Sequence, residues 1–370
     1  MHKEEQIKHI SKQFHIHGAI QHAETCKIGH INQTYIAEYD QGGNRVKYVL
    51  QKINQSVFTQ PKKVINNLIR VTNQIRHKLE TSGADDVTRR VITLVDSREG
   101  GPYYIDAEGD YWRCFVFIEG IKSYEAVENH QQAYQAGKAF GKFQAYMSDL
   151  EGERLHETIP QFHNARMRFD RFSEAVSADK YNRTQSAKKE IDFCYASESF
   201  VDTLLKALET GAIQERVTHN DTKFNNVLMD IVTDEERCVV DLDTVMPGLV
   251  HYDFGDMVRT TTSRTLEDER DLSKVKMEMD LFRELARGYI TATSNFLTPE
   301  ERNLLAFSGK LMTFVIGLRF LTDYLAGDKY FRVHRPGHNL DRAKTQFKLT
   351  QSIAEHEEEM KAFIESLSQS

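Results

Sequence analysis

The fold is decided by the stretch His219-Asn220-Asp221-Thr222-Lys223-Phe224-Asn225-Asn226, which Val239-Val240-Asp241-Leu242-Asp243 follows. Asn226 comes five residues after Asp221, and Asp241 comes twenty residues after Asp221 at the end of a short apolar run. An Asp and an Asn at this spacing, with a second Asp on a following strand, are typical of phosphoryl transfer. The stretch therefore predicts a catalytic loop and two oxygen ligands for a metal ion.

Each residue of this set has an expected role. Asp221 is placed to accept the proton of an acceptor hydroxyl, and Asn226 and Asp241 supply the oxygens that Mg²⁺ prefers, so ATP and Mg²⁺ are the expected cofactors. His219 is expected to brace the loop by hydrogen bonds rather than to act as the base. Asp243 lies on the same strand face as Asp241, so it either reaches the metal or substrate or only anchors the loop.

Composition restricts the kind of protein. The chain of 370 residues is long enough for two domains. Its net charge of -7, without basic runs, argues against a nucleic-acid or membrane partner. The four cysteines form no C-x-x-C pair and are expected to be reduced thiols. With no signal segment and no apolar run of membrane-spanning length, we expect a cytoplasmic enzyme with a small-molecule substrate, as a monomer or homodimer.

The first third of the chain is expected to form strands and one helix. The helix begins at Pro61, and its apolar residues recur at helical spacing. In chain order the pattern predicts strands at Glu24–Ile28, Thr34–Tyr39 and Val46–Ile53, the helix, a strand at Val91–Val95, and a hairpin of Tyr103–Ile105 with Tyr111–Ile118. This order is that of the small lobe of a kinase, with Glu119-Gly120 as the hinge.

The rest of the chain is expected to be mostly helical. Thr298 begins a helix with a capping hydroxyl and Pro at the first position. Gly137 and Gly141 indicate close helix packing, and Asp253 or Asp256 is expected to brace the catalytic loop. The predicted helices are Gln131–Met147, Ser186–Glu209, Lys274–Thr293, Pro299–Leu325 and Leu340–Leu367. The fold class is therefore α+β and bilobal like a protein kinase, with residues 1–119 as a nucleotide-binding N-lobe and residues 120–370 as a C-lobe.

The nucleotide is expected to bind the N-lobe. Lys52 on the third strand is the candidate for gripping the phosphates, although a register slip of one residue would turn it to the other face. Gly29 and Asn32 belong to the loop that would cover the phosphates, and Glu119 belongs to the hinge. That loop is not G-x-G-x-x-G, no Walker A motif occurs, and the helix from Pro61 has no acid before Glu80. These departures exclude a protein kinase.

Four motifs carry a resemblance to a known family. They are Gly29-His30-Ile31-Asn32-Gln33-Thr34-Tyr35, Leu50-Gln51-Lys52-Ile53-Asn54, the opening stretch, and Asp241-Leu242-Asp243-Thr244-Val245-Met246-Pro247-Gly248. From about residue 25 to 350 the chain resembles the N-acetylhexosamine 1-kinase branch of the aminoglycoside phosphotransferase and choline kinase superfamily. The resemblance implies phosphorylation of the anomeric hydroxyl of GlcNAc or GalNAc. It also implies that His30, Arg319 and Tyr330 contact the sugar.

Several alternatives stay open from the residues themselves. Arg319 could instead form a salt bridge on a helix surface, and Tyr330 could be an amphipathic rim residue. The acceptor could be another alcohol, such as choline, homoserine, methylthioribose or an aminoglycoside. A non-catalytic nucleotide-binding protein on the same fold is the third alternative. The presence of Asp221, Asn226 and Asp241 together counts against it.

Overall fold

The computed structural model describes residues 3–26 and 31–367, and the chain folds into two compact units. Unit 1 comprises residues 1–121, 152–160 and 240–245. Unit 2 comprises residues 122–151, 161–239 and 246–370. The segment 240–245, which carries Asp241 and Asp243, therefore belongs to unit 1 although it follows the catalytic loop in sequence.

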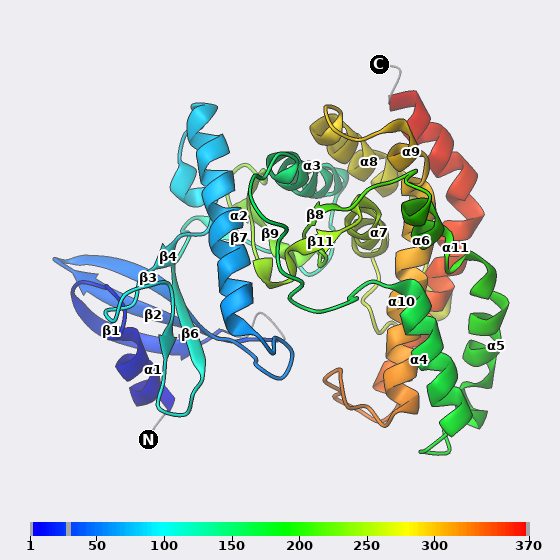
Figure 1. Cartoon of the computed structure of the whole chain (residues 1–370), viewed down its shortest axis with the longest axis horizontal. Coiled ribbons are helices and arrows are strands. Elements are labelled where there is room, and N and C mark those ends of the chain that lie inside the picture. Colours follow the sequence, from blue (N-terminus) through cyan, green and yellow to red (C-terminus); the bar gives the residue numbers. More distant parts are fainter. Residues whose placement is uncertain (1–2, 27–30, 368–370) are drawn as a thin grey trace. The chain divides into compact units, whose positions relative to one another are not determined.

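An antiparallel sheet forms the centre of unit 1 (Figure 1). Its order is β1-β2-β3-β6-β4, and β5 pairs with β6. The strands are β1 Ala19–Thr25, β2 Gln33–Gln41, β3 Asn44–Lys52, β4 Leu94–Val95, β5 Tyr104–Ile105 and β6 Tyr111–Val116; β7 Ile121–Lys122 lies at the boundary with unit 2. The predicted succession of strands and the hairpin are confirmed, but the first strand begins five residues earlier than Glu24.

One face of this sheet packs against a helix that the sequence pattern did not predict. Helix α1, Lys3–Ser11, places Ile7 and Ile10 in one core with Leu50 and Trp112. Leu50 of β3 and Trp112 of β6 are both nearly inaccessible to solvent. Burial of large apolar side chains is the main stabilising contribution in such a core. Leu50 and Trp112 thus mark the α1 face of the sheet.

The opposite face belongs to α2, Pro61–Thr81. Val64 and Ile65 of α2 cluster with Tyr111 of β6, which points away from its neighbour Trp112 because alternate strand residues face opposite sides. The short turn η5, Leu242–Thr244, also contacts α2. The apolar stripe predicted for this helix is confirmed, since all its members are buried: Val64, Leu68, Val71 and Ile75.

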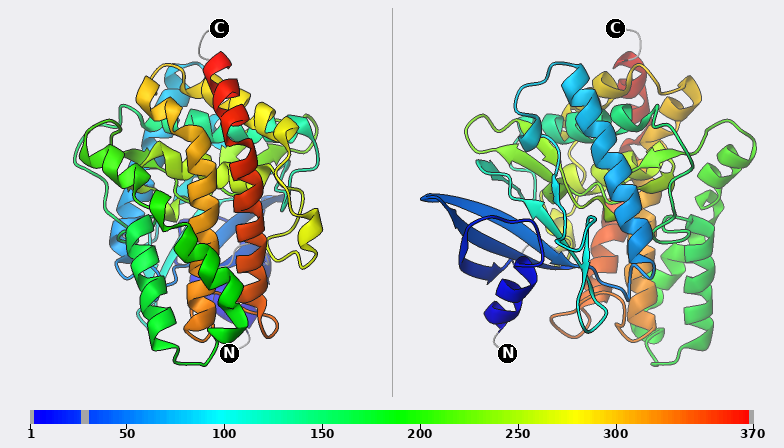
Figure 2. Two further views of the ribbon diagram at one scale, coloured as in Figure 1. Left: turned by 90° about the vertical axis from the view of Figure 1, so that its right-hand side faces the viewer. Right: turned by 60° about the vertical axis from the view of Figure 1, so that its left-hand side comes forward.

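Helices build most of unit 2. They are α3 His130–Met147, α4 Ala165–Ala178, α5 Lys188–Ala196, α6 Thr203–Glu209, α7 Val250–Thr261, α8 Met279–Thr293, α9 Pro299–Asn303, α10 Leu305–Leu325 and α11 His338–Leu367, with 3-10 turns η2 Gln185–Ala187, η3 Glu198–Phe200, η4 Phe224–Asn226 and η6 Leu272–Lys274. In unit 1, η1 spans Val87–Arg89. Helices α10 and α11 run side by side, as Figure 2 shows. The predicted α+β class is confirmed.

Some helix predictions need correction. The continuous helix expected over Ser186–Glu209 breaks at Ser197, which caps α5 with αR geometry and begins the turn η3. Helix α8 begins at Met279 rather than Lys274, and the chain between Pro299 and Leu325 breaks at Leu304. Helices α4 and α7 were not predicted. Competing polar residues at the ends of these segments weakened the helical periodicity.

Helices α3 and α8 approach each other closely, as the glycines predicted. A Cβ on Gly137 would overlap the main-chain oxygen of Leu285, and one on Gly288 would overlap that of Tyr134. The capping box at Thr298 is also present, with the Thr298 side chain accepting from Glu301 N at 3.1 Å. Both local predictions are therefore confirmed.

One helix among the described residues is long and apolar enough to cross a membrane. It is α10, and 89% of its most apolar window is buried inside the protein. Burial of this kind is that of a core helix, since its neighbours α4, α7 and α11 cover it.

Short strand pairs carry the catalytic stretch of unit 2. Strand β8, Arg216–Thr218, pairs with β11, Met246–Gly248, and β9, Val227–Asp230, pairs with β10, Glu236–Val239. The stretch 219–226 is the loop between β8 and β9, as predicted. All four cysteines are free thiols, which confirms that expectation.

Candidate active site

Asp253 of α7 fixes the catalytic loop by accepting hydrogen bonds from its main chain. One carboxylate oxygen accepts from the main-chain N of Asn220 at 2.7 Å, and the other from that of His219 at 2.9 Å. Gln144 donates to the same carboxylate at 2.7 Å. Burial raises the pKa of Asp253 to about 7, against the opposite effect of these three donors. The expectation that Asp253 braces the loop is confirmed.

His219 lies wholly inside unit 2. Its ring contacts the edges of Phe140 and Phe143, and its Nδ1 accepts from the main-chain N of Asp221 at 3.3 Å. The next residue, Asn220, has a φ of 65°, a left-handed conformation that Asn tolerates better than most residues. The loop therefore turns sharply just before Asp221, and His219 braces it as predicted.

Asp221 and Asn226 lie next to each other at the two ends of the loop. The Asn226 side-chain nitrogen donates to the main-chain O of Asp221 at 2.8 Å and reaches its Oδ2 at 3.3 Å. With its nitrogen turned toward Asp221, the Asn226 side chain offers its Oδ1 to other partners. An amide oxygen beside a carboxylate suits a hard cation such as Mg²⁺. These two residues therefore fit the predicted metal and base roles.

Lys223 keeps the Asp221 carboxylate ionised. Its Nζ lies 3.0 Å from Oδ1 of Asp221. Burial by itself raises the pKa of Asp221, but the charge of Lys223 and its hydrogen bond outweigh burial, so the pKa lies below its ordinary value. In return, the charge of Asp221 raises the pKa of Lys223. Asp221 is therefore a carboxylate at neutral pH, the form that can accept a proton.

A second layer of charges supports this pair. Arg259 of α7 donates to Asp256 at 2.8 Å and to Glu267 at 3.0 Å. Burial lowers the pKa of Arg259, but Asp256 and Glu267 outweigh it and raise that pKa overall. The charge of Arg259 also lowers the pKa of Asp221. The ion-paired Arg259 thus contributes to the field around the catalytic carboxylate.

In unit 1, Asp241 and Asp243 begin the turn η5. Asp241 is exposed and has a φ of 60°, whereas Asp243 is buried. Arg113 of β6 binds Asp243 with two parallel hydrogen bonds, Nη1 to Oδ1 at 2.6 Å and Nη2 to Oδ2 at 2.9 Å. Of the two roles left open for Asp243, these contacts favour the anchor over the contact with substrate.

Asn32 joins the same network. Its Nδ2 donates to Asp243 Oδ2 at 2.6 Å, and its Oδ1 accepts from the main-chain N of Asn54 at 3.0 Å. Gln51 of β3 accepts from Arg113 Nη2 at 2.7 Å. Asn32, predicted to bind nucleotide, is therefore engaged with both ends of its side-chain amide. The structure brings Asn32 and Asp243 together, a pair that the sequence did not connect.

The register of β3 shows the face of the sheet on which Lys52 lies, and its predicted role in phosphate binding stays a prediction. Lys52 lies opposite Trp112, on the α1 face of the sheet, and its ammonium pairs with Asp110. Gln51 lies opposite Arg113, on the face that carries the Asp243 network. One residue of register decides the face. The cation on the Asp243 face is therefore Arg113, and Lys52 ends in an ion pair on the other side.

The hinge candidate Glu119 has an exposed side chain, 64% accessible, whose carboxylate lies 3.8 Å from Lys47. The main-chain oxygens of Glu119 and Gly120 each accept from Arg89, both at 3.1 Å. Arg89 in turn lies 3.1 Å from Asp86. The structure thus shows Glu119 held through its main chain, and a nucleotide role for it stays a prediction.

Arg319 of α10 and Tyr330 lie together, as the resemblance implied. The Arg319 guanidinium lies 4.9 Å from the centre of the Phe162 ring, 5.6 Å from that of Phe331 and 5.8 Å from that of Tyr330. Tyr330 is 54% exposed. Among residues 3–26 and 31–367, no carboxylate oxygen lies within 4.0 Å of Arg319. The structure therefore does not support the alternative of a helix-surface salt bridge.

Not every predicted site residue can be placed. Gly29 and His30 lie outside the described residues. Asp221 and Asn226 belong to unit 2 and Asp241 to unit 1. Sequence reasoning missed four basic residues: Lys223, which pairs with Asp221; Arg113, which binds Asp243; Arg259, which pairs with Asp256; and Arg168, which binds the main-chain O of Phe162. Only Lys223 carried a sequence signal, because it stands two residues after Asp221.

Residues 22–275 match the phosphotransferase enzyme family, so the match covers most of the chain. The chain belongs to this family. It is therefore a phosphotransferase.

Solved structures show the same fold at low identity. A microcompartment-associated aminopropanol kinase has a TM-score of 0.58 at 14% identity, with 96% of this chain and 98% of that chain covered. A spectinomycin phosphotransferase, solved with ADP and spectinomycin, has a TM-score of 0.58 at 13% identity with the same coverage. A choline kinase from Cryptosporidium parvum has a TM-score of 0.57 at 14% identity, with 99% of both chains covered. The kinase-like fold class is confirmed.

Proposed function

We propose that the protein is an ATP- and Mg²⁺-dependent N-acetylhexosamine 1-kinase that phosphorylates the anomeric hydroxyl of GlcNAc or GalNAc. The observation that carries the proposal is the ionised Asp221 beside Asn226, within the motifs that resemble this branch of the family. Arg319 and Tyr330, which the resemblance assigns to the sugar, lie together on one side of unit 2. Two mechanistic roles follow from this site.

The first role is proton acceptance. The acceptor oxygen attacks the γ-phosphorus of ATP, its proton passes to an Oδ of Asp221, and the bond from the γ-phosphorus to the bridging oxygen breaks to release ADP. Lys223 keeps Asp221 ionised before the transfer. The carboxylate therefore orients the hydroxyl and takes up the proton at the end of the step.

The second role is to hold the metal. Asn226 and Asp241 would supply oxygens to Mg²⁺, which neutralises the phosphate oxygens when it is bound. The fit rests on the orientation of Asn226, whose nitrogen is engaged with Asp221. Asp253 holds the loop that carries Asp221 through two main-chain bonds. Unit 2 therefore presents base and ligand in a fixed relation before substrate arrives.

Local charge favours a sugar over a cationic alcohol. Arg319 and Arg168 both contact Phe162. Nε2 of the adjoining His163 donates to the main-chain O of Asn220 in the catalytic loop at 2.8 Å. Two guanidinium groups this near the loop repel a cation such as choline or ethanolamine. An aromatic side chain beside an Arg, as with Tyr330 and Arg319, suits the apolar face and hydroxyls of a sugar.

The test is a panel of acceptors with Mg²⁺-ATP, followed by phosphorus NMR of the product. The panel contains GlcNAc, GalNAc, choline, homoserine and an aminoglycoside. We expect a sugar 1-phosphate from GlcNAc or GalNAc, and no product when the anomeric position is blocked as a methyl glycoside. Turnover of choline or homoserine without turnover of either hexosamine would reject the sugar assignment and leave the kinase family assignment intact.

A further inference from the structure

Two arginines of unit 2 lie together without an acidic partner. Arg168 of α4 donates to the main-chain O of Phe162 from Nη2 at 2.8 Å and from Nε at 3.2 Å. Arg319 of α10 stacks on the ring of the same Phe162. Across the part of the chain that the structure describes, neither arginine has a carboxylate oxygen within 4.0 Å. Phe162 thus brings two unneutralised guanidinium groups into one place.

The positive charge of Arg319 disfavours the charged state of Arg168. Burial, followed by the positive charge of Arg319, lowers the pKa of Arg168 to about 9, and Arg171 acts in the same direction. Arg168 therefore remains charged at neutral pH, at an electrostatic cost. The chain carries a net charge of -7, so acidic side chains outnumber basic ones in the chain as a whole. A like-charge pair that is only partly exposed is the arrangement that an anion stabilises.

Hydrogen bonds to Asp323 fix the loop that lies beside the two arginines. Asp323 of α10 accepts from the main-chain N of Lys329 and Tyr330 at 2.8 Å, and from that of Phe331 at 2.9 Å. Asn339 donates to the same carboxylate at 2.9 Å. The nearest acid along α10 is therefore turned toward the loop after the helix. That loop holds the rings of Tyr330 and Phe331 against Arg319.

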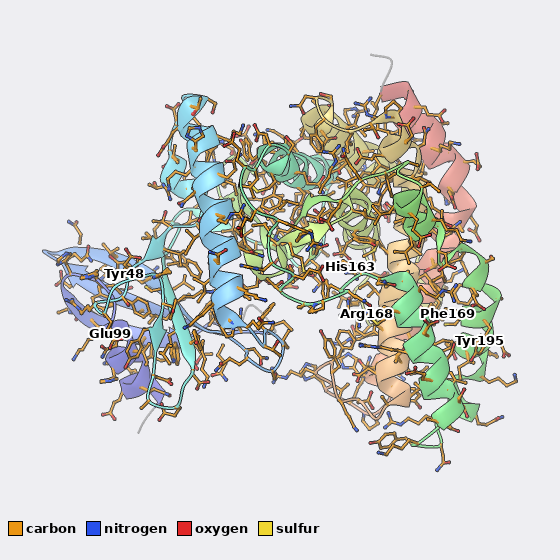
Figure 3. The ribbon with its side chains drawn as sticks, viewed as in Figure 1. Tyr48, Glu99, His163, Arg168, Phe169 and Tyr195 are labelled. Carbon is orange, nitrogen blue, oxygen red and sulfur yellow. The ribbon has the colours of Figure 1, made fainter. Side chains whose placement is uncertain are left out.

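The pair lies close to the catalytic loop. His163 precedes α4, and Arg168 lies in the first part of α4 where that helix packs on α10 (Figure 3). The His163 ring reaches the main-chain O of Asn220, the residue before Asp221. Burial, and the charges of Arg319 and Arg168 against an opposite effect of Asp256, lower the pKa of His163 to about 4. The positive field of the pair thus extends to the residue that contacts the loop.

We propose that Arg168 and Arg319 form an oxyanion subsite beside the catalytic loop, which takes a carboxylate or a phosphate group of a ligand. Arginine presents a planar fork of donors that matches both kinds of group. The aromatic rings of Phe162 and Phe331 hold the Arg319 guanidinium in place while its N–H groups remain for the ligand. The subsite goes beyond the proposed sugar kinase, because it recognises an acid group whichever alcohol is phosphorylated.

Binding to the nucleotide-free protein tests the subsite without any turnover. Inorganic phosphate and glucuronate are titrated separately by calorimetry, so that the two kinds of oxyanion are distinguished, and GlcNAc is the neutral comparison. We expect Arg168→Gln and Arg319→Gln each to weaken oxyanion binding at least about tenfold, the effect of losing a charge-assisted hydrogen bond. Arg171→Gln is the matched control, because Arg171 is exposed on the same helix, and its affinity should stay within about twofold of wild type.

Chemical protection on the wild-type protein removes any dependence on the variants folding. Phenylglyoxal modification is mapped by mass spectrometry with and without phosphate or glucuronate. We expect either oxyanion to slow modification of Arg168 and Arg319 and to leave Arg171 unchanged. Binding that is equal in all three variants, or no protection at saturating oxyanion, would overturn the subsite. A failure to phosphorylate GlcNAc would overturn only the proposed function.

Discussion

Arg113 and Asp243 form a two-pronged ion pair inside unit 1, with side chains only 3% and 2% exposed. The pair joins β6 to the turn η5, which Asp241 precedes as the N-terminal capping residue. Asn32 and Gln51 occupy further positions around the two groups. In protein kinases a strand lysine and a helix glutamate form a comparable pair, whereas here a strand arginine binds the segment that carries the predicted metal ligand itself.

Breaking this pair should destabilise unit 1. Because it leaves one buried charge without its partner, Arg113→Gln is expected to cost about 3–5 kcal/mol of unfolding free energy in urea titrations. Arg113→Lys should recover only part, since an ammonium cannot make both parallel bonds. The control is Arg45→Gln, because Arg45 is 81% exposed in its pair with Glu38. A loss no larger than that of the control would contradict the anchoring role.

The double variant Arg113→Met with Asp243→Leu separates stability from catalysis. Replacing both charges by apolar side chains of similar size should restore most of the unfolding free energy. Phosphoryl transfer should nevertheless remain low, because the apolar pair cannot fix Asp241 through directed hydrogen bonds. The check is kcat measured beside the urea midpoint. Full activity in a stable double variant would show that the ion pair has no positioning role.

Lys52→Met should leave nucleotide use nearly intact. Lys52 lies on the α1 face and pairs with Asp110, so removing its charge takes no group from the Asp243 face. We expect kcat/KM for ATP to change by less than about threefold, because the pair is partly exposed and far from fully buried. A fall of a hundredfold or more would instead restore Lys52 as the phosphate-binding lysine.

Asp221→Asn should lower kcat by about 10²- to 10⁴-fold, the usual contribution of a general base. The amide cannot accept the proton, but it keeps the shape of the side chain and the contact with Asn226. Nucleotide affinity, measured by calorimetry, should stay near that of wild type. Loss of nucleotide binding in the same proportion as kcat would indicate a collapsed loop rather than a missing base.

Lys223→Met should move the acid side of the pH profile. Burial raises the pKa of Asp221, and Lys223 is the main group that lowers it. Removal of Lys223 should therefore raise the pKa of Asp221. The active form is the carboxylate, so activity is lost as the pH falls through this pKa. The acid limb of kcat/KM should therefore shift to higher pH in Lys223→Met and return in Lys223→Arg. An unshifted limb would remove Lys223 from the control of Asp221.

The buried residue His251 makes the free energy of unfolding depend on pH in the acid range. Burial lowers the pKa of His251 from 6.5 to about 4, and its Nε2 lies 2.9 Å from the main-chain O of Glu301. Between these values the unfolded chain binds a proton that the folded chain does not, so this contribution is lost as the pH falls from 6.5 toward 4. The difference in unfolding free energy between wild type and His251→Gln should shrink by up to about 3 kcal/mol over that range. His17→Gln, at an exposed position, should show no such trend.

The catalytic loop could be predicted because its residues are close together in the sequence. Asp221 and Asn226 belong to one short turn, so their spacing alone predicts that they meet, and the structure places them in contact. The helix from Pro61 could also be predicted, because its apolar residues recur at the spacing of one buried helix face. Asp253 or Asp256 was expected to brace the loop, and the structure shows that Asp253 does so through two main-chain hydrogen bonds.

The remaining relationships depend on register and on long-range packing. Arg113 and Asp243 stand 130 residues apart, and nothing in either neighbourhood names the other. The face on which Lys52 lies could not be predicted, because one residue of strand register reverses every side chain. Arg168 carried no motif, and its importance comes only from sharing Phe162 with Arg319.

The sequence by itself therefore determined the reaction, since phosphoryl transfer needs a base and metal ligands at short, fixed spacings. It also determined the fold class, because hydrophobic periodicity sets the order of strands and helices. Only the tertiary structure decided which cation faces Asp243 and which arginines lack an acid. Charges act through space over a few ångströms, and the distance between two side chains is set by packing rather than by their separation along the chain.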